Sequence, residues 1–328
     1  MSVIYNSTEI RRETIDKGLL INKLASIYEI EDIDSIPKGD MPGDKIQIGE
    51  EHLMKAKTIL PKLIDILIPI LNDHPKQRAV ISVCGGSGVG KSEIASLLSY
   101  YLTKLNLDSY TLSGDNYPHR IPKYNDAERL RIYRQNGIRG LISHGEYITG
   151  RHEILMQLQE ASQDANCEYI KEYPWLSIYQ QAGRNGLKNY LGTTKEINFS
   201  EITNIISQFK NGADTIYMKR MGREETQLWY EAIDCSKKKV IIIEWTHGNN
   251  DNLHGVDIPI LLNSTPEETL AHRKARNRDG ATDSPFTSVV LDIEQDLLVS
   301  QASKAKVIVA KNGDILTYSD YMKLMSNK

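Results

Sequence analysis

Short apolar runs alternate with helix-like segments from residue 77 onward. Five segments predict strands, and all but the more polar Ser109–Ser113 are nearly continuous apolar runs of the kind found in a parallel sheet covered on both faces. The residues after the first run, and those after the capping box that begins at Thr265, have helical spacing. The pattern therefore predicts an α/β fold. The predicted strands are Ala79–Cys84, Ser109–Ser113, Lys239–Trp245, Val256–Asn263 and Ala305–Ala310.

Two regions do not follow this alternation. Residues 1–76 predict a helical N-terminal extension, with helices over Thr8–Tyr28 and Gly49–Leu71 around an acidic loop that contains proline and glycine. The second helix is expected to pack on the main domain (residues 77–328), although a separate interaction role is an alternative. Residues 114–238 separate the second and third predicted strands, far more than an ordinary crossover needs. Residues 117–195 of this stretch are mostly helical by pattern, and they predict an acceptor-binding insertion.

Composition and charge narrow the class of protein. The chain has 328 residues, of which 40% are hydrophobic and 25% charged, as in globular proteins. A net charge of −3 gives no electrostatic reason to expect nucleic acid as a partner. The most apolar long stretch, Ile59–Leu71, contains prolines and charged residues, so no membrane span is expected. The three cysteines, Cys84, Cys167 and Cys235, are widely spaced, which predicts no zinc site and a reduced, cytoplasmic setting.

The segment after the first predicted strand carries the strongest motif of the chain. It fits G-x-x-x-x-G-K-[ST], and it lies between a predicted strand and a predicted helix, as a phosphate-binding loop does. Glycines allow the backbone N–H groups to surround a polyphosphate at the start of the helix. Lys91 would reach the β- and γ-phosphates of ATP, and the Ser92 hydroxyl would ligate Mg²⁺. The predicted loop residues are Gly85, Gly86, Ser87, Gly88, Val89, Gly90, Lys91 and Ser92.

Two acidic residues follow later predicted strands. Asp115 comes after the second strand, where the carboxyl ends of parallel strands face a ligand crevice, and it is the candidate general base for an attacking hydroxyl. The alternative is a turn or capping aspartate, because Gly-Asp-Asn also favours turns. Glu244 ends the third strand and is the candidate partner of Mg²⁺. The alternative for Glu244 is a carboxylate that emerges into solvent.

Basic residues gather in two further places. The cluster of Arg273, Arg276 and Arg278 predicts a lid in which Arg276 acts in catalysis and the other two bind ATP, unless it is merely the solvated basic end of a helix. His119 and Arg120 follow Asp115 closely, and they are predicted to hold an anionic group of the acceptor. Neighbouring Tyr117 is predicted to contact the acceptor as well, and Arg129 with the next arginines is expected on a charged helix face.

Together these features resemble the phosphoribulokinase/uridine kinase family of P-loop kinases, to which pantothenate kinase is related. The resemblance covers roughly residues 77–115 and 195–312, and only the phosphate loop is highly specific. Trp245 stands where the family often has glycine, and the extension and the insertion match no part of the family. The matching pieces are Gly85–Ser92, Ser113–Tyr117, Val240–Glu244, Arg273–Asp279, and a helix and short strand within Ile197–Gly212 and Ile216–Lys219.

The resemblance implies a three-layer P-loop NTPase fold with core strand order 2-3-1-4-5 and a kinase that uses MgATP. Its catalytic aspartate falls on Asp115, its strand-end acid on Glu244 and its lid arginines on the 273–278 region. The expected acceptor is a sugar, sugar phosphate or nucleoside, and a homodimer is compatible with this assignment. The alternatives are a pantothenate- or glycerate-type kinase, or a P-loop ATPase or switch that acts on a protein partner.

Overall fold

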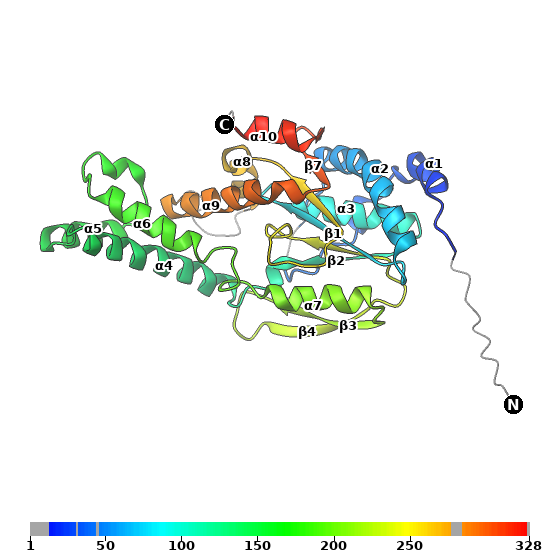
Figure 1. Ribbon diagram of the computed structural model, residues 1–328, viewed down its shortest axis with the longest axis horizontal. Helices are drawn as coiled ribbons and strands as arrows, with labels where there is room; N and C mark the ends of the chain where they lie inside the picture. Colours follow the sequence, from blue (N-terminus) through cyan, green and yellow to red (C-terminus); the bar gives the residue numbers. More distant parts are fainter. Residues whose placement is uncertain (1–12, 31, 44–45, 277–283, 327–328) are drawn as a thin grey trace.

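The computed structural model describes residues 13–30, 32–43, 46–276 and 284–326, leaving aside the side chains of residues 34, 275 and 276. Figure 1 shows the arrangement of its helices and strands. The helices are α1 Lys17–Ile27, α2 Glu50–Asp73, α3 Lys91–Lys104, α4 Pro122–Ser143, α5 Thr149–Glu160, α6 Leu176–Lys188, α7 Phe199–Lys210, α8 Pro266–Arg276, α9 Pro285–Gln301 and α10 Tyr318–Ser326, with 3-10 turns η1 Ile33–Ser35, η2 Gly114–Asn116, η3 Cys167–Ile170 and η4 Ala302–Lys304. The strands are β1 Ala79–Gly85, β2 Ser109–Ser113, β3 Thr215–Met221, β4 Leu228–Asp234, β5 Val240–Glu244, β6 Ile258–Leu262, β7 Val307–Val309 and β8 Ile315–Leu316.

The main sheet has the order β2-β5-β1-β6-β7-β8. The first five strands are parallel, and β8 adds an antiparallel edge to β7. These five parallel strands lie within the five segments that the sequence predicts or extend one by a residue, and their order is the expected 2-3-1-4-5. The α/β fold class is thus confirmed. Strands β3 and β4 form a separate hairpin. The short strand that the sequence predicts near Ile216 is part of β3, whereas β4 is not among the predicted strands.

One face of the sheet is covered by the extension together with α3. In α1, helix formation begins only at Lys17, because the Asp16 side chain caps it by accepting a hydrogen bond from the Leu19 amide. Helix α2 directs a continuous apolar stripe at the sheet, in which Leu60 and Leu63 have no solvent exposure. This stripe belongs to the same hydrophobic core as the strands and α3. The extension therefore forms part of the layer that covers the sheet.

The opposite face is covered in two parts. Helix α7 and the β3–β4 hairpin pack near β2 and β5, below the sheet in Figure 1. Helices α9 and α10 pack near β6 and β7, where Cys84 is buried. Helices therefore lie on both faces, as the uninterrupted burial of β1, β5 and β6 requires.

The insertion projects from the edge of this three-layer body (Figure 1). Helices α4 and α6 pack along each other at close range, because Gly137 leaves room for the Tyr179 ring and Gly183 leaves room for the Tyr133 ring. Phe286 of α9 also stacks edge-on against Tyr133. Helix α9 therefore joins the insertion to the body.

Across the described residues, no helix combines the length and apolarity that crossing a membrane demands.

Candidate active site

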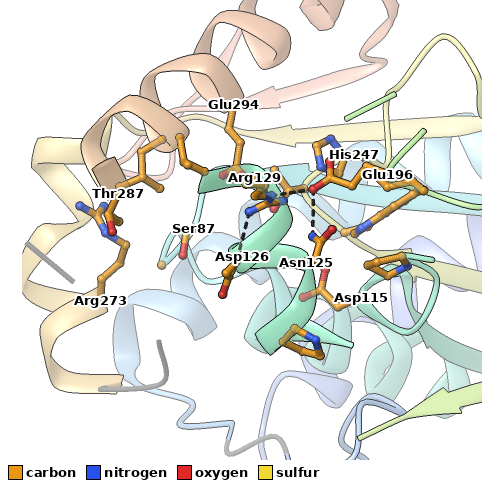
Figure 2. Close-up of a pocket in the computed structure, with 18 of the residues that line it drawn as sticks. Ser87, Asp115, Asn125, Asp126, Arg129, Glu196, His247, Arg273, Thr287 and Glu294 are labelled. Atoms are coloured by element: carbon orange, nitrogen blue, oxygen red, sulfur yellow. Dashed lines mark hydrogen bonds and ion pairs between the residues drawn. The ribbon is translucent and has the colours of Figure 1, made fainter. Parts of the chain in front are cut away.

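A cavity of about 750 Å³ lies between the carboxyl ends of the sheet strands and the base of the insertion. Its floor is the loop after β1, and its walls come from η2, α4, α8 and α9 (Figure 2). Side chains from these five segments meet here although they are far apart in the sequence.

The loop after β1 has the backbone geometry of a phosphate cradle. Gly85, Gly88 and Gly90 all have positive φ angles, and a Cβ on any of them would lie within 3.0 Å of a neighbouring atom. Helix α3 begins at Lys91, so its first amides face the loop. The Lys91 ammonium donates a hydrogen bond to the Gly86 carbonyl at 3.0 Å, which holds it over the loop. This arrangement suits a polyphosphate anion.

Glu244 lies beside this cradle. Pairing of β1 with β5 brings Glu244 opposite Val83, and the side chain lines the cavity although it is almost completely buried. Burial raises the pKa of Glu244 to about 7; Lys91 and the Ser92 hydroxyl lower it, whereas Asp115 raises it further. Carboxylate oxygens are ligands that hard cations prefer, so ionised Glu244 can serve as one.

The donor set fits Mg²⁺ that arrives with a nucleotide. Ser92 and Glu244 both line the cavity next to the cradle. In the part of the chain that the structure describes, no cluster of three His, Cys, Asp or Glu side chains forms a complete metal site. Mg²⁺ commonly takes one or two protein ligands and completes its shell with phosphate oxygens and water. Oxygen ligands from Ser92 and Glu244 match this pattern.

Asp115 lies in η2, directly after β2, and its exposed side chain lines the same cavity. Trp245 packs against this turn, and its ring lies so close to Gly114 that a Cβ on Gly114 would overlap it. Neighbouring Asn116 is buried and accepts a hydrogen bond from the Met221 amide at 3.0 Å. The structure thus brings Asp115 into one cavity with Lys91 and the strand-end acid.

Helix α8 covers the phosphate loop from the other side. The Arg273 side chain lies against Gly88, and its Nη1 donates to the Pro266 carbonyl at 2.6 Å and to the Thr269 hydroxyl at 2.5 Å. Arg273 therefore lines the cavity while its guanidinium is held by its own helix. Arg276 is the last residue of α8, and its side chain and the whole of Arg278 lie outside the described residues.

The residues expected to bind the acceptor are not among those that line the cavity. Tyr117 is completely buried in the core between the sheet and α7, so its predicted contact with a ligand needs correction. The His119 ring interacts with the Thr194 carbonyl at 3.1 Å, and Arg120 donates to the Tyr190 hydroxyl at 3.0 Å. Although they follow Asp115 in the sequence, their side chains are held by the chain between α6 and α7 and do not line the cavity.

A different polar cluster lines the cavity at the base of the insertion, and the sequence analysis does not predict it. Arg129 of α4 donates to the Glu196 carboxylate at 2.6 Å, and Asn125, one helical turn earlier, donates to the same oxygen at 2.9 Å. Glu294 of α9 lies 3.9 Å from Arg129 (Figure 2). The i, i+4 spacing of Asn125 and Arg129 is visible in the sequence, but their carboxylate partners are distant in the chain.

Burial gives this cluster unusual ionisation. The pKa of Glu294 is raised to about 7 by burial, against the opposing effect of Arg129. Burial also tends to raise the pKa of Glu196, but Arg129 and the Gly192 amide hold it below its ordinary value. His247 is buried next to them, and burial lowers its pKa to about 4, so its ring is neutral at pH 7. This wall of the cavity therefore offers hydrogen-bonding groups of mixed charge.

Comparison with known proteins gives one relative among curated sequences. No family model matches the chain. It is 38% identical, over 242 residues, to the bifunctional alpha-galactosidase/sucrose kinase AgaSK of Mediterraneibacter gnavus, a match that covers 74% of this chain. The same match covers 21% of AgaSK, so the chain spans about a fifth of the length of this relative.

Two solved structures are also similar in part. One is titled "putative fructose transport system kinase" from Silicibacter sp. TM1040; it has a TM-score of 0.42 and 14% identity, over 76% of this chain and 92% of that one. The other is titled "Possible Uridine Kinase" from Bacillus stearothermophilus; it has a TM-score of 0.41 and 14% identity, over 76% of this chain and 98% of that one.

Proposed function

We propose that the chain is an ATP-dependent kinase of the phosphoribulokinase/uridine kinase type that phosphorylates a hydroxyl group of a neutral sugar. The observation that carries the proposal is a single cavity that holds a phosphate cradle, a lysine, a strand-end glutamate and Asp115 next to a polar wall. These are the groups that phosphoryl transfer needs for positioning and charge stabilisation. The similarity to AgaSK, whose name includes sucrose kinase activity, supports the same reading.

Asp115 has the role of general base in this proposal. Its carboxylate accepts the proton of the acceptor hydroxyl while the hydroxyl oxygen attacks the γ-phosphorus of ATP. The bond between the γ-phosphorus and the bridging oxygen breaks, and ADP leaves with that oxygen. Lys91 stabilises the charge on the phosphate oxygens, and the loop amides hold the β-phosphate. Mg²⁺, held by Ser92 and Glu244, would neutralise further charge on the β- and γ-phosphates.

A neutral sugar suits the acceptor side better than a phosphorylated or carboxylated one. Arg129 is the cation at the centre of this wall, and it is already paired with Glu196. Asp126 and Glu294 lie within 3.9 Å of the same guanidinium. Three carboxyl groups around one arginine, of which Glu294 with its pKa of about 7 is partly protonated at neutral pH, disfavour a further anion and accept hydrogen bonds from sugar hydroxyls. The acceptor is therefore proposed to be uncharged, with sucrose as the first candidate because of the name of the relative.

The test is the release of ADP by purified protein with MgATP, measured against a panel of acceptors. The panel holds sucrose, glucose, fructose, their 6-phosphates, uridine, pantothenate and glycerate. We expect a neutral sugar to stimulate ADP release, and Asp115→Asn to reduce that stimulated rate by about 10²-fold or more. Product analysis by mass spectrometry would show the added phosphoryl group on the sugar.

Two other outcomes would contradict the proposal and favour a rival function. Stimulation by pantothenate or glycerate alone would contradict the neutral acceptor and favour a kinase for carboxylate-bearing metabolites. Hydrolysis of ATP without any acceptor, unchanged in Asp115→Asn, would contradict the kinase and favour an ATPase that acts on a protein partner. The cytoplasmic setting, the homodimer and the domain limits predicted from the sequence stay predictions.

A further inference from the structure

The loop between α1 and α2 reaches the turn that carries Asp115. Asp40 of this loop is buried, with 7% of its side chain exposed. Its Oδ1 accepts hydrogen bonds from the Ser113 amide at 2.6 Å and from the Asn116 side chain at 3.1 Å. Its Oδ2 accepts a hydrogen bond from the Tyr110 hydroxyl at 2.9 Å and lies 2.9 Å from Nη1 of Arg220. One carboxylate of the extension therefore contacts β2, η2 and β3.

Two of these contacts flank Asp115 in the chain. Ser113 ends β2, and Asn116 ends the η2 turn, so Asp40 holds the residues on both sides of Gly114 and Asp115. The Asn116 side chain is fixed at its other end by the Met221 amide. The backbone of this turn sets where the Asp115 side chain enters the cavity. Asp40 is thus placed to control that backbone.

The charge of Asp40 is well compensated at neutral pH. Burial raises the pKa of Asp40 to about 6, with a small further rise from Glu231, against the lowering effects of Arg220, the Ser113 amide and the Tyr110 hydroxyl. A buried carboxylate is costly unless it is paired and hydrogen-bonded, and here both conditions hold. The short Ser113 contact is a charge-assisted hydrogen bond, which fixes geometry more strongly than a neutral one.

We propose that Asp40 is a positioning residue for catalysis, through which the N-terminal extension fixes the turn that presents Asp115 to the acceptor hydroxyl. The proposal rests on the proposed function, in which Asp115 is the general base. The neighbouring Met41 lines the cavity, so the same loop also borders the candidate site. A misplacement of a base by about 1 Å can reduce a rate about 10²-fold, and a contact of this kind is therefore large enough to matter.

The test compares Asp40→Asn with a matched control in the same extension, Asp65→Asn, which removes an exposed ion pair to Lys17. We expect Asp40→Asn to lower kcat about 10- to 100-fold and to leave the KM for ATP within about twofold, while Asp65→Asn changes neither. The decisive comparison is a double-mutant cycle with Asp115→Asn. When the base is already absent, Asp40→Asn should change the residual rate by less than about twofold.

A purely structural role gives a different result. In that case Asp40→Asn would lower the rate by the same factor with and without Asp115, and the inference would be overturned. If Asp40→Asn does not fold because buried Arg220 keeps only Glu231 as a carboxylate partner, the variant Asp40→Asn/Arg220→Met removes both charges and takes its place in the cycle.

A second measurement does not depend on kinase activity. Hydrogen exchange of peptides covering residues 110–117 should become faster in Asp40→Asn, while peptides of α3 and β1 keep their protection. Unchanged exchange in residues 110–117 would overturn the inference. If wild-type protein shows no acceptor-dependent ADP release, the proposed function fails, and the exchange result still shows whether Asp40 holds the turn.

Discussion

Gly114 and Trp245 fit together so closely that neither can be replaced freely. A Cβ on Gly114 would lie 2.1 Å from the indole Cγ, well inside van der Waals contact. We predict that Gly114→Ala lowers the free energy of unfolding by about 1–3 kcal/mol, the usual range for overpacking, and lowers kcat as the turn moves. Urea unfolding and the sugar kinase assay measure the two effects.

The control for this substitution is Gly150→Ala in α5, where a Cβ would meet no atom within 4 Å. Alanine is favoured over glycine within helices, so Gly150→Ala should be neutral or stabilising by up to about 1 kcal/mol. Equal destabilisation by both alanines would contradict the role given to the contact between Gly114 and Trp245.

Glu294 gives a prediction about pH and stability. Its pKa is raised from 4.5 to about 7, by burial first, with Glu196 and Asp115 adding to the rise and Arg129 and Lys91 opposing it. Between pH 4.5 and 7 the folded protein holds this proton more tightly than the unfolded chain does. The free energy of unfolding therefore falls as pH rises through this range, and the favourable contribution is lost above pH 7.

Glu294→Gln removes this titration. Relative to wild type, Glu294→Gln should be more stable at pH 8 than it is at pH 5, which thermal unfolding at both values measures. Glu153→Gln, at an exposed position of α5, is the control variant for the same measurements. A constant difference between Glu294→Gln and wild type at both pH values would contradict the raised pKa.

Sequence predicts single site residues where a local motif sets their geometry. Lys91 and Asp115 line the cavity because each follows a parallel strand whose carboxyl end meets the site. Tyr117, two residues later, is buried in the core, because a short turn redirects the side chain. Arg129 and Glu196 could not be paired in advance, since their contact depends on how α4 packs against the chain after α6.

Helix α2 shows that the extension is part of the hydrophobic core. Leu63 is completely buried against the sheet, whereas Met54 of the same helix is 64% exposed. We predict that Leu63→Ala lowers the free energy of unfolding by about 2–5 kcal/mol and that Met54→Ala stays within about 0.5 kcal/mol. Chemical unfolding gives both values, and a small effect of Leu63→Ala would mean that α2 is separable from the core.

Among the elements, apolar runs were predictable and exposed strands were not. The parallel strands β1, β5 and β6 are buried throughout, so their composition is close to uniformly apolar and marks them clearly. Strand β4 is almost entirely exposed and polar at several positions, and its pairing with β3 defines it. Strand β8 has only two residues, which is too short for a pattern. Contacts between segments, which a single sequence does not display, determine these two strands.

At the scale of the whole molecule, the cavity joins two parts with separate tasks. In the proposed kinase, the phosphate loop and α8 form the nucleotide side, α4 and the chain near Glu196 form the acceptor side, and α9 borders both. Helix α9 holds the two together, since Phe286 packs on Tyr133 in the insertion while Leu298 packs in the body. Substitutions on the acceptor side should therefore change the KM for the acceptor and leave the KM for ATP nearly unchanged.

Asp126 provides the test of this division. It lines the cavity from α4, and its side chain is 65% exposed, so Asp126→Ala should not disturb folding. A hydrogen bond between a carboxylate and a sugar hydroxyl is worth about 1.5–3 kcal/mol, which predicts a rise of about 10- to 100-fold in the KM for the sugar. The KM for ATP should stay within about twofold, and Glu153→Ala, on an exposed face of α5, should change neither constant. If the two KM values rose together in Asp126→Ala, nucleotide and acceptor would share this wall, and the division of the cavity between body and insertion would be wrong.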